Sequence, residues 1–286
     1  MSWRRFAQIQ VFASAACFST AGLFMGLIAA EIWTVVFWRS LFAFAFTCIL
    51  MTFDIGRNVV KPDRAGLVAS GLSAGAMLAF IAALRLTSVA NVAVIHGSLP
   101  LMAALLGWLI VKQRISASTS ALCTVAGLGA AVIFYGSASS GLRLAGDGLA
   151  LLMTLQMALM TIAFQRSRTP SLMLVAFSNG LAASVAVLFA PALAVSLETA
   201  AMLACFAFVQ MTLGLLFYTI GSRVLPVAET ALITLAEVPM SVFWVWVAFG
   251  QMPGQPTVIG AGIILSAVLV YLAGPGRNPG GFSDAD

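Results

Sequence analysis

The sequence contains few charged residues. Only 8% of its 286 residues are Asp, Glu, Lys or Arg, whereas 62% are hydrophobic, and the mean hydropathy is +1.07. Charges this sparse leave too little polar surface to cover a soluble globular protein, whose helices need a charged face toward water. The composition therefore predicts an integral membrane protein in contact with the lipid bilayer.

Residues that bind metals or cofactors are also scarce. The chain has one histidine and four cysteines, and the cysteines fall inside apolar runs without the spacing of metal ligands. It has no His-Glu-x-x-His sequence and no phosphate-binding loop of the form Gly-x-x-x-x-Gly-Lys-Ser/Thr. We therefore expect no metal, no cofactor and no ATP-driven step, and we expect the cysteines to pack as small apolar residues without forming disulfides.

Long apolar runs dominate the sequence instead. Each is about twenty residues long, which is the length a helix needs to cross a ~30 Å hydrocarbon core, and none alternates as a β-barrel strand does. The predicted fold class is all-α integral membrane, with ten transmembrane helices. The spans are expected at residues 8–28, 33–53, 65–85, 89–110, 118–137, 147–165, 172–191, 199–221, 226–249 and 257–274.

An internal repeat divides the chain into two halves. Residues 90–95 (Ala-Asn-Val-Ala-Val-Ile), followed by Pro100, return as residues 228–233 (Ala-Glu-Thr-Ala-Leu-Ile), followed by Pro239. Repeats in an apolar chain are the usual build of secondary transporters, whose substrate site lies where the repeats meet. We expect residues 1–137 and 138–275 to form two five-helix repeats around a central cavity. The polar residues 276–286 are expected to form a disordered cytoplasmic tail.

The basic residues indicate the orientation in the membrane. Eleven of the fourteen flank one side of the ten-span arrangement, Arg85 and Arg143 flank the other, and Arg39 lies within the second span. By the positive-inside rule both termini are cytoplasmic. We expect the membrane to be the cell inner (plasma) membrane. The net charge of +5 is then a topology signal, and no nucleic-acid partner is expected. The eleven are Arg4, Arg5, Arg57, Lys61, Arg64, Lys112, Arg114, Arg166, Arg168, Arg223 and Arg277.

Several motifs resemble those of a known family. They are residues 37–43 (Phe-Trp-Arg-Ser-Leu-Phe-Ala), residues 83–90 (Ala-Leu-Arg-Leu-Thr-Ser-Val-Ala) and residues 224–228 (Val-Leu-Pro-Val-Ala), together with the proline-marked fourth helix of each half. Over nearly the whole chain the sequence resembles the drug/metabolite transporter superfamily, in particular its EamA-type ten-helix exporters. Among these it is most similar to YddG-like exporters of aromatic and other bulky amino acids.

The resemblance implies export of small metabolites from the cytoplasm by alternating access through a central cavity. Without ATP machinery, such transport is either facilitative or driven by an ion gradient. The family usually carries a Gly-Glu pair after helices 4 and 9. Here those places read Lys112-Gln113 and Gly250-Gln251, so both acidic residues are replaced.

Ionisable residues at membrane depth are the first candidates for substrate binding, because burying them is costly. They are Arg39, His96, Glu229 and Glu237. His96 and Glu237 each lie within one turn of the proline of their repeat, and so at matching depth in helices 4 and 9. A zwitterionic amino acid needs an acceptor for its ammonium group, which Glu237 offers, and donors for its carboxylate, for which His96, Asn91 and Arg39 are candidates.

Further candidates are aromatic or polar residues within the spans. Tryptophans also belong to interfacial belts, and polar side chains also bond neighbouring helices, so each has a structural alternative. Pro100 and Pro239 each remove a backbone hydrogen bond and are expected to act as hinges or kinks. Proton coupling through His96 and Glu237 stays open beside uncoupled transport. The remaining predicted substrate-binding residues are Trp38, Phe80, Asn179, Gln210, Tyr218 and Trp244.

Two other classes of protein fit parts of the sequence. Residues 71–75 (Gly-Leu-Ser-Ala-Gly) match the Gly-x-Ser-x-Gly pattern of serine hydrolases, with His96 as a base, but the strand-to-helix turn of those enzymes is not expected here. A membrane scaffold or sensor gives no reason for buried charges in both halves. We therefore expect no enzyme. Within transport, the alternative substrates are purines, polyamines and cationic drugs, and a lone Glu237 without a neighbouring donor would favour a cation carrier.

Overall fold

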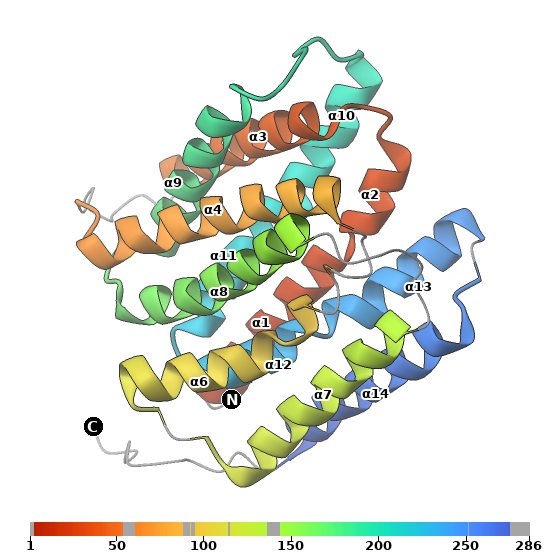
Figure 1. Cartoon of the computed structure of the whole chain (residues 1–286). Coiled ribbons are helices and arrows are strands. Elements are labelled where there is room, and N and C mark those ends of the chain that lie inside the picture. The colour runs from red at the N-terminus through yellow and green to blue at the C-terminus, as the bar shows by residue number, and fades with distance from the viewer. Residues whose placement is uncertain are drawn as a thin grey trace.

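The computed structural model describes residues 3–53, 61–87, 92, 95–113, 115–135, 144–250 and 252–274, with only the backbone for residues 84, 85, 134 and 135. Within these ranges the chain is helical and contains no strand (Figure 1). The predicted tail at residues 276–286 lies outside them. The helices are α1 (Trp3–Ser19), α2 (Ala21–Leu27), α3 (Ile32–Phe53), α4 (Arg64–Leu86), α6 (Leu99–Val111), α7 (Ala117–Tyr135), α8 (Leu144–Arg166), α9 (Ser171–Ala186), α10 (Leu197–Phe206), the π-helix η1 (Ala207–Gly214), α11 (Leu215–Ser222), α12 (Val227–Thr234), α13 (Glu237–Phe249) and α14 (Gln255–Ala273).

The ends of several helices follow from single residues. Asp63 caps α4 and Ser196 caps α10, each accepting a hydrogen bond from a backbone N–H of the first turn. Lys112 ends α6 and Gly250 ends α13 in the left-handed conformation, with φ of 55° and 64°. These two positions are the first residues of the two loop sequences singled out above, Lys112-Gln113 and Gly250-Gln251.

The structure confirms an all-helical membrane protein. Seven helical segments in the described ranges are long and apolar enough to cross a membrane, and three shorter apolar helices accompany them. Each of these segments overlaps one predicted span. In the described ranges, however, seven of the ten predicted spans are full-length helical segments, and the other three are shorter. The fourth span is broken before Pro100, and α9 already ends at Ala186, five residues before the predicted end of its span. The short helices are Leu99–Val111, Ala117–Ile133 and Ser171–Ala186.

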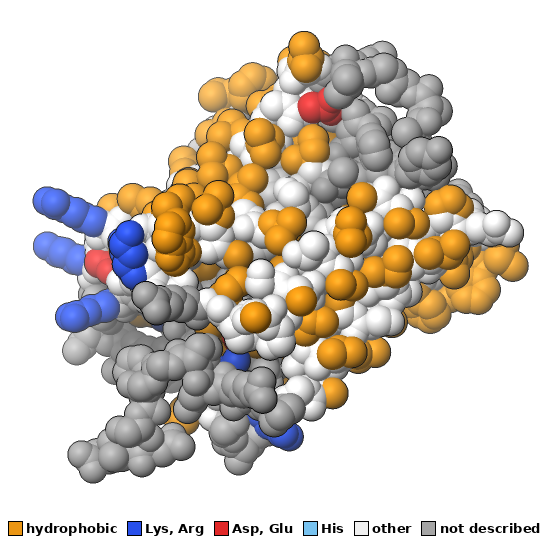
Figure 2. Space-filling model, turned by 60° about the horizontal axis from the view of Figure 1, so that its bottom comes forward, with side chains coloured by type: hydrophobic (Ala, Val, Ile, Leu, Met, Phe, Trp, Pro, Cys, Tyr) orange, Lys and Arg blue, Asp and Glu red, His pale blue; other side chains and the backbone are white. Residues whose placement is uncertain are grey.

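The outer surface is that of a protein surrounded by lipid. Figure 2 shows hydrophobic side chains over much of the visible face and Lys and Arg side chains gathered at one end. Large apolar residues point outward on several helices, among them Leu105, Trp108, Phe243 and Val247. Such a surface would aggregate in water but is stable in contact with hydrocarbon chains.

Helices from the two halves of the sequence pack against each other throughout the molecule. α4 lies beside α8 and α9, α3 lies beside α9, and α7 lies beside α14 (Figure 1). α7 and α14 approach each other closely, since a Cβ built on Gly260 would lie 2.3 Å from the carbonyl oxygen of Gly129. Only glycine permits two helix backbones to come this close.

Three membrane segments are interrupted within their length. α1 and α2 meet at a turn at Thr20, residues 95–97 and α6 meet at a turn at Ser98, and α12 and α13 meet at a turn at residues 235–236. The last two turns end within three residues before Pro100 and Pro239, which have no backbone N–H to donate to a continuous helix. In a fourth segment, η1 widens the helix into a π-helix, a feature often found at functional sites.

Candidate functional site

His96 and Glu237 are in direct contact at two of these interruptions. His96 Nε2 lies 2.9 Å from Glu237 Oε1, and the two residues come from opposite halves of the chain. Their side chains are 12% and 19% exposed, so the pair is largely buried but still accessible. Glu237 is the first residue of α13, where the N–H groups of the helix start favour a negative charge. The other ring nitrogen of His96, Nδ1, is buried and has no hydrogen-bond partner in the part of the chain that is described.

Arg39 lies in a second polar cluster. Its Nη1 donates to Gln210 Oε1 at 2.7 Å, and the amide nitrogen of Gln210 donates to the carbonyl of Phe18 at 3.1 Å. Gln210 belongs to η1, and Phe18 lies at the end of α1, so the cluster joins α3, η1 and α1. Arg39 is only 7% exposed, and Gln210 is 5% exposed. The cluster is therefore fixed inside the protein by hydrogen bonds between three segments.

Ser19 connects this region to the helix that carries Glu237. Trp244 Nε1 donates to Ser19 Oγ at 3.0 Å, and Ser241 Oγ donates to the carbonyl of Ser19 at 3.0 Å. Glu237, Ser241 and Trp244 are spaced by four and three residues and so share one face of α13. The face of α13 that carries Glu237 thus packs on the end of α1, next to the carbonyl that receives Gln210.

The other predicted site residues make different contacts. Tyr218 is fully buried, and its hydroxyl lies 2.6 Å from Thr161 Oγ1. Trp38 Nε1 donates to the carbonyl of Leu193 at 2.8 Å. Asn179 is buried and donates to a carbonyl of its own helix, α9. Phe80 is 37% exposed on α4, and Asn91 lies outside the described residues. The structure therefore brings together His96 with Glu237, and Arg39 with Gln210.

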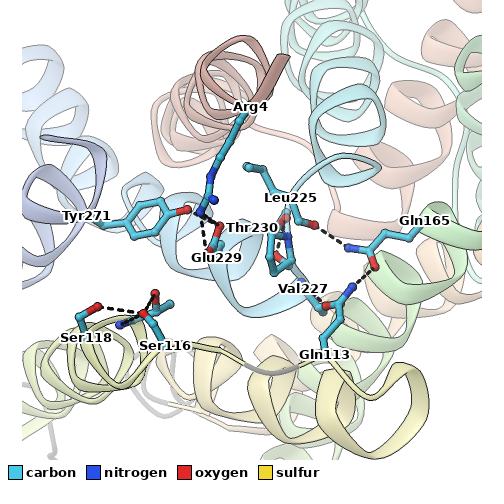
Figure 3. A network of polar contacts seen from close by, with 12 residues as sticks. Arg4, Gln113, Ser116, Ser118, Gln165, Leu225, Val227, Glu229, Thr230 and Tyr271 are labelled. Atoms are coloured by element: carbon cyan, nitrogen blue, oxygen red, sulfur yellow. Dashed lines mark hydrogen bonds and ion pairs between the residues drawn. The ribbon is translucent and has the colours of Figure 1, made fainter. Parts of the chain in front are cut away.

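Glu229 forms an ion pair at the basic end, which we define as the end of the molecule that carries Arg4, Lys61, Lys112 and Arg166. Arg4 Nη2 contacts both carboxylate oxygens of Glu229 at 2.8 and 3.0 Å, and the Tyr271 hydroxyl donates to the same carboxylate (Figure 3). Glu229 is 2% exposed. This contact ties α1, α12 and α14 together.

Gln113 forms a second set of hydrogen bonds at the basic end. Its Oε1 accepts a hydrogen bond from the N–H of Val227 at 3.1 Å, and its Nε2 donates to Gln165 Oε1 at 3.0 Å (Figure 3). Gln165 in turn donates to the carbonyl of Leu225 at 2.7 Å. The loop after α6 is thereby docked on the start of α12. The sequence indicated this position only through its resemblance to EamA-type transporters, which usually carry Glu here.

Asp63 organises a third contact at the basic end. Its carboxylate accepts hydrogen bonds from the hydroxyls of Thr169 (2.6 Å) and Ser167 (2.7 Å) and from the backbone N–H groups of Arg168 (3.0 Å) and Gly66 (2.9 Å). These bonds, that of Thr169 first, hold the pKa of the carboxyl well below its usual range. The loop between α8 and α9 is thus fastened to the start of α4.

Two hollows open between helices. One of about 350 Å³ lies between the connections α2–α3 and α9–α10, with Glu31, Thr34, Ser196 and Thr199 among its lining residues. The other, of about 190 Å³, lies between α2 and α13. Neither is lined by His96, Glu237 or Arg39. Residues 71–75, which match the hydrolase pattern, lie within α4, so they do not form the strand-to-helix turn that this pattern requires.

The first half of the chain matches a known family. Residues 5–135, from α1 to the end of α7, match the EamA-like transporter family. No match was found among curated proteins. Twenty-nine chains of solved structures match. One of them, described only as a crystal structure of a protein, has a TM-score of 0.81 at 17% sequence identity and covers 93% of this chain and 96% of its own. At this identity the likeness shows the fold alone.

Proposed function

Because residues 5–135 match the EamA-like transporter family and the chain is a multi-pass helical membrane protein, we propose that it is a secondary transporter of small molecules. Its substrates are amino acids, chiefly aromatic and other bulky neutral ones, and it exports them by alternating access. The observation that carries the proposal is the contact between His96 and Glu237, at interruptions of two helices from opposite halves.

The chemistry of this pair fits a zwitterion. A carboxylate such as Glu237 binds an ammonium group, and an imidazole beside it supplies a hydrogen-bond donor for a carboxylate. A cation carrier would have Glu237 without a neighbouring donor, whereas here His96 lies 2.9 Å away. The pair also offers a site for a proton, since an imidazole nitrogen and a carboxylate oxygen can each bind one, and proton coupling is part of the proposal.

Packing between the halves supports the proposal of two repeats, residues 1–137 and 138–275. α4 of the first half packs on α8, and the equivalent contact is that of α11 and η1 in the second half with α1. Likewise α4 packs on α9, and the equivalent contact is that of η1 and α10 with α3. α7 pairs with α14, and α6 pairs with α12. This is the pattern that two equivalent units would produce around a common axis.

Alternating access requires that one end of the molecule closes while the other opens. The three contacts at the basic end, centred on Glu229, Gln113 and Asp63, hold that end closed. By the positive-inside rule this end faces the cytoplasm of the inner membrane, with both termini on that side. Export then requires these contacts to open so that substrate can enter.

Counterflow in proteoliposomes tests the proposal. Vesicles hold an unlabelled amino-acid mixture, and labelled phenylalanine, methionine or threonine is added outside. We expect wild-type protein to take up label above empty vesicles, and Glu237→Gln and His96→Ala to lower the rate at least about tenfold, the effect of losing a charged hydrogen bond. The matched control is Glu198→Gln, because Glu198 is exposed on α10, away from the pair. Folded, inserted protein that takes up no amino acid would refute the substrate class.

A further inference from the structure

Arg39 carries a buried charge that no acidic residue balances. It lies within α3 and is 7% exposed, and no carboxylate oxygen lies within 4 Å of its guanidinium group in the described ranges. A lone charge at membrane depth is costly, so such residues are kept mainly where they act on a substrate or an ion. Arg39 therefore needs an anion that the described residues do not supply.

One edge of the guanidinium group is available for that anion. Among the described residues, Nη1 is occupied by Gln210, Nε has no hydrogen-bond partner, and Nη2 contacts the sulfur of Met77, at 2.7 Å. Nε and Nη2 form the edge that binds a carboxylate through two parallel hydrogen bonds. A thioether is a weak acceptor, and the methionine side chain is flexible. Met77 can therefore be displaced by a stronger acceptor.

The surroundings of Arg39 hold it in place and add an aromatic wall. Gln210 fixes Nη1 and is itself bonded to the carbonyl of Phe18. The ring of Phe206 lies 5.1 Å from the central carbon of the guanidinium, and Phe24 stacks on that ring at 4.8 Å between centroids. An anion bound at the Nε–Nη2 edge thus lies close to apolar aromatic surface, which suits an organic anion with an apolar side chain.

We propose that the Nε–Nη2 edge of Arg39 binds the carboxylate group of the transported substrate, with Met77 occupying this edge when no substrate is present. The inference rests on the proposed transport function and restricts its substrates to compounds that carry a carboxylate. Purely cationic drugs and polyamines are then excluded as ligands of this edge. The alternative ligand for this edge is a chloride ion, which would also supply a negative charge beside Arg39.

Ligand binding to the purified full-length protein tests the inference, with three probes that share one ring: phenylalanine, 3-phenylpropionate, which lacks the ammonium group, and 2-phenylethylamine, which lacks the carboxylate. Binding is measured by ligand-dependent thermal shift. We expect Arg39→Met to weaken binding of the two carboxylates at least about tenfold, the effect of losing a charged hydrogen bond. Binding of 2-phenylethylamine stays as in the wild type. Arg166→Met is the matched control, because Arg166 is exposed at the basic end.

A second variant separates binding from a structural role of Arg39. Met77→Ala removes the competing sulfur, so we expect it to bind 3-phenylpropionate roughly threefold or more tightly than the wild type. A purely structural arginine predicts no such gain. Unliganded Arg39→Met should elute as a single folded species, because an apolar residue of similar volume tolerates the site of a buried charge.

Three results would overturn the inference. The first is unchanged carboxylate binding in Arg39→Met, and the second is unchanged or weaker binding of 3-phenylpropionate in Met77→Ala. The third is a rise in melting temperature with sodium chloride alone that Arg39→Met abolishes, with no further rise when a carboxylate is added. Failure of the amino-acid proposal gives a different pattern. In that case no amino acid shows counterflow, yet 3-phenylpropionate binding still depends on Arg39.

Discussion

At the scale of single residues, the described charged groups within the membrane segments fall into two kinds. Glu229 has a full set of partners in Arg4 and Tyr271 and ties three helices together. Arg39 and the pair His96–Glu237 keep unused hydrogen-bonding capacity, at Nε of Arg39 and Nδ1 of His96. Buried polar atoms are nearly always paired, so each unpaired one calls for an explanation, and at Arg39 and His96 the explanation that we propose is a bound ligand.

The Asp63 carboxylate makes the stability of the protein depend on pH. Its pKa is lowered in the folded state by the hydrogen bonds from Thr169, Arg168, Ser167 and Gly66. A lowered folded-state pKa stabilises the protein above the unfolded value of about 3.9, and this contribution is lost as pH falls through the folded value. We therefore expect Asp63→Asn to have a lower melting temperature than the wild type at pH 7, and the gap to narrow below about pH 4.

Thermal melts of both proteins in detergent between pH 7 and pH 3 check this expectation. Glu198→Gln serves as the control, since Glu198 is exposed and lies away from this cluster. A gap between Asp63→Asn and the wild type that stays constant with pH would show that the carboxylate charge does not stabilise the loop.

At the scale of helices, the two left-handed ends are not equivalent. Gly250 ends α13 without strain, whereas Lys112 adopts a φ of 55° at the end of α6. A non-glycine residue costs about 1–2 kcal/mol in this conformation. The Lys112 ammonium lies 5.8 Å from the Trp108 ring, a contact that contributes about 0.5–1 kcal/mol at an exposed site. The conformational cost of Lys112 therefore exceeds the stabilisation from its contact with the ring.

Lys112→Gly is therefore expected to raise the stability of the protein by up to about 1.5 kcal/mol, the difference between these two effects. The measurement is the melting temperature in detergent. Lys112→Ala is the control, because it removes the same charge and the ring contact but keeps a Cβ. If Lys112→Ala stabilises the protein as much as Lys112→Gly does, the backbone explanation is wrong.

The contact between α7 and α14 depends on glycine at position 260. A Cβ there would lie 2.3 Å from the carbonyl oxygen of Gly129 and 2.5 Å from the side chain of Ile133, so the helices must move apart. Gly260→Ala is expected to destabilise the protein by about 1–3 kcal/mol, the usual cost of overpacking.

The same helix offers a matched control. A Cβ on Gly262 would meet nothing within 4 Å, so Gly262→Ala should be neutral or slightly stabilising. Melting temperatures and the fraction of monodisperse protein distinguish the two variants. Equal behaviour of Gly260→Ala and Gly262→Ala would contradict the close approach of the two helices.

Sequence patterns were sufficient for the helices but not for their contacts. Apolar runs indicate each membrane segment because burial in lipid depends on local composition. The prolines at positions 100 and 239 coincide with interrupted helices because a missing N–H is also a local property. The π-helix around Gln210, the docking of Gln113 on Val227 and the approach of Gly129 to Gly260 join residues far apart in the chain. No local pattern encodes which distant segments meet, so the sequence could not predict them.

At the scale of the whole molecule, helices from both halves meet along a line of polar residues. Arg39 bonds Gln210, Gln210 bonds the end of α1, and Ser19 at that end bonds the face of α13 that carries Glu237. Glu237 then contacts His96 from the other half. The contacts at the basic end, centred on Glu229, Gln113 and Asp63, are separate from this line of residues. The proposed opening of that end can therefore be coupled to the central residues only through the helices between them.

A double-mutant cycle on substrate counterflow tests most directly whether the His96–Glu237 contact is the substrate site. The rates of wild type, His96→Asn, Glu237→Gln and the double variant are measured with labelled phenylalanine. If the two residues act as one unit, the double variant loses no more than the more impaired single variant, with a coupling energy of at least about 1 kcal/mol. Losses that simply add, or single variants with wild-type rates, would contradict the assignment of the site to this contact.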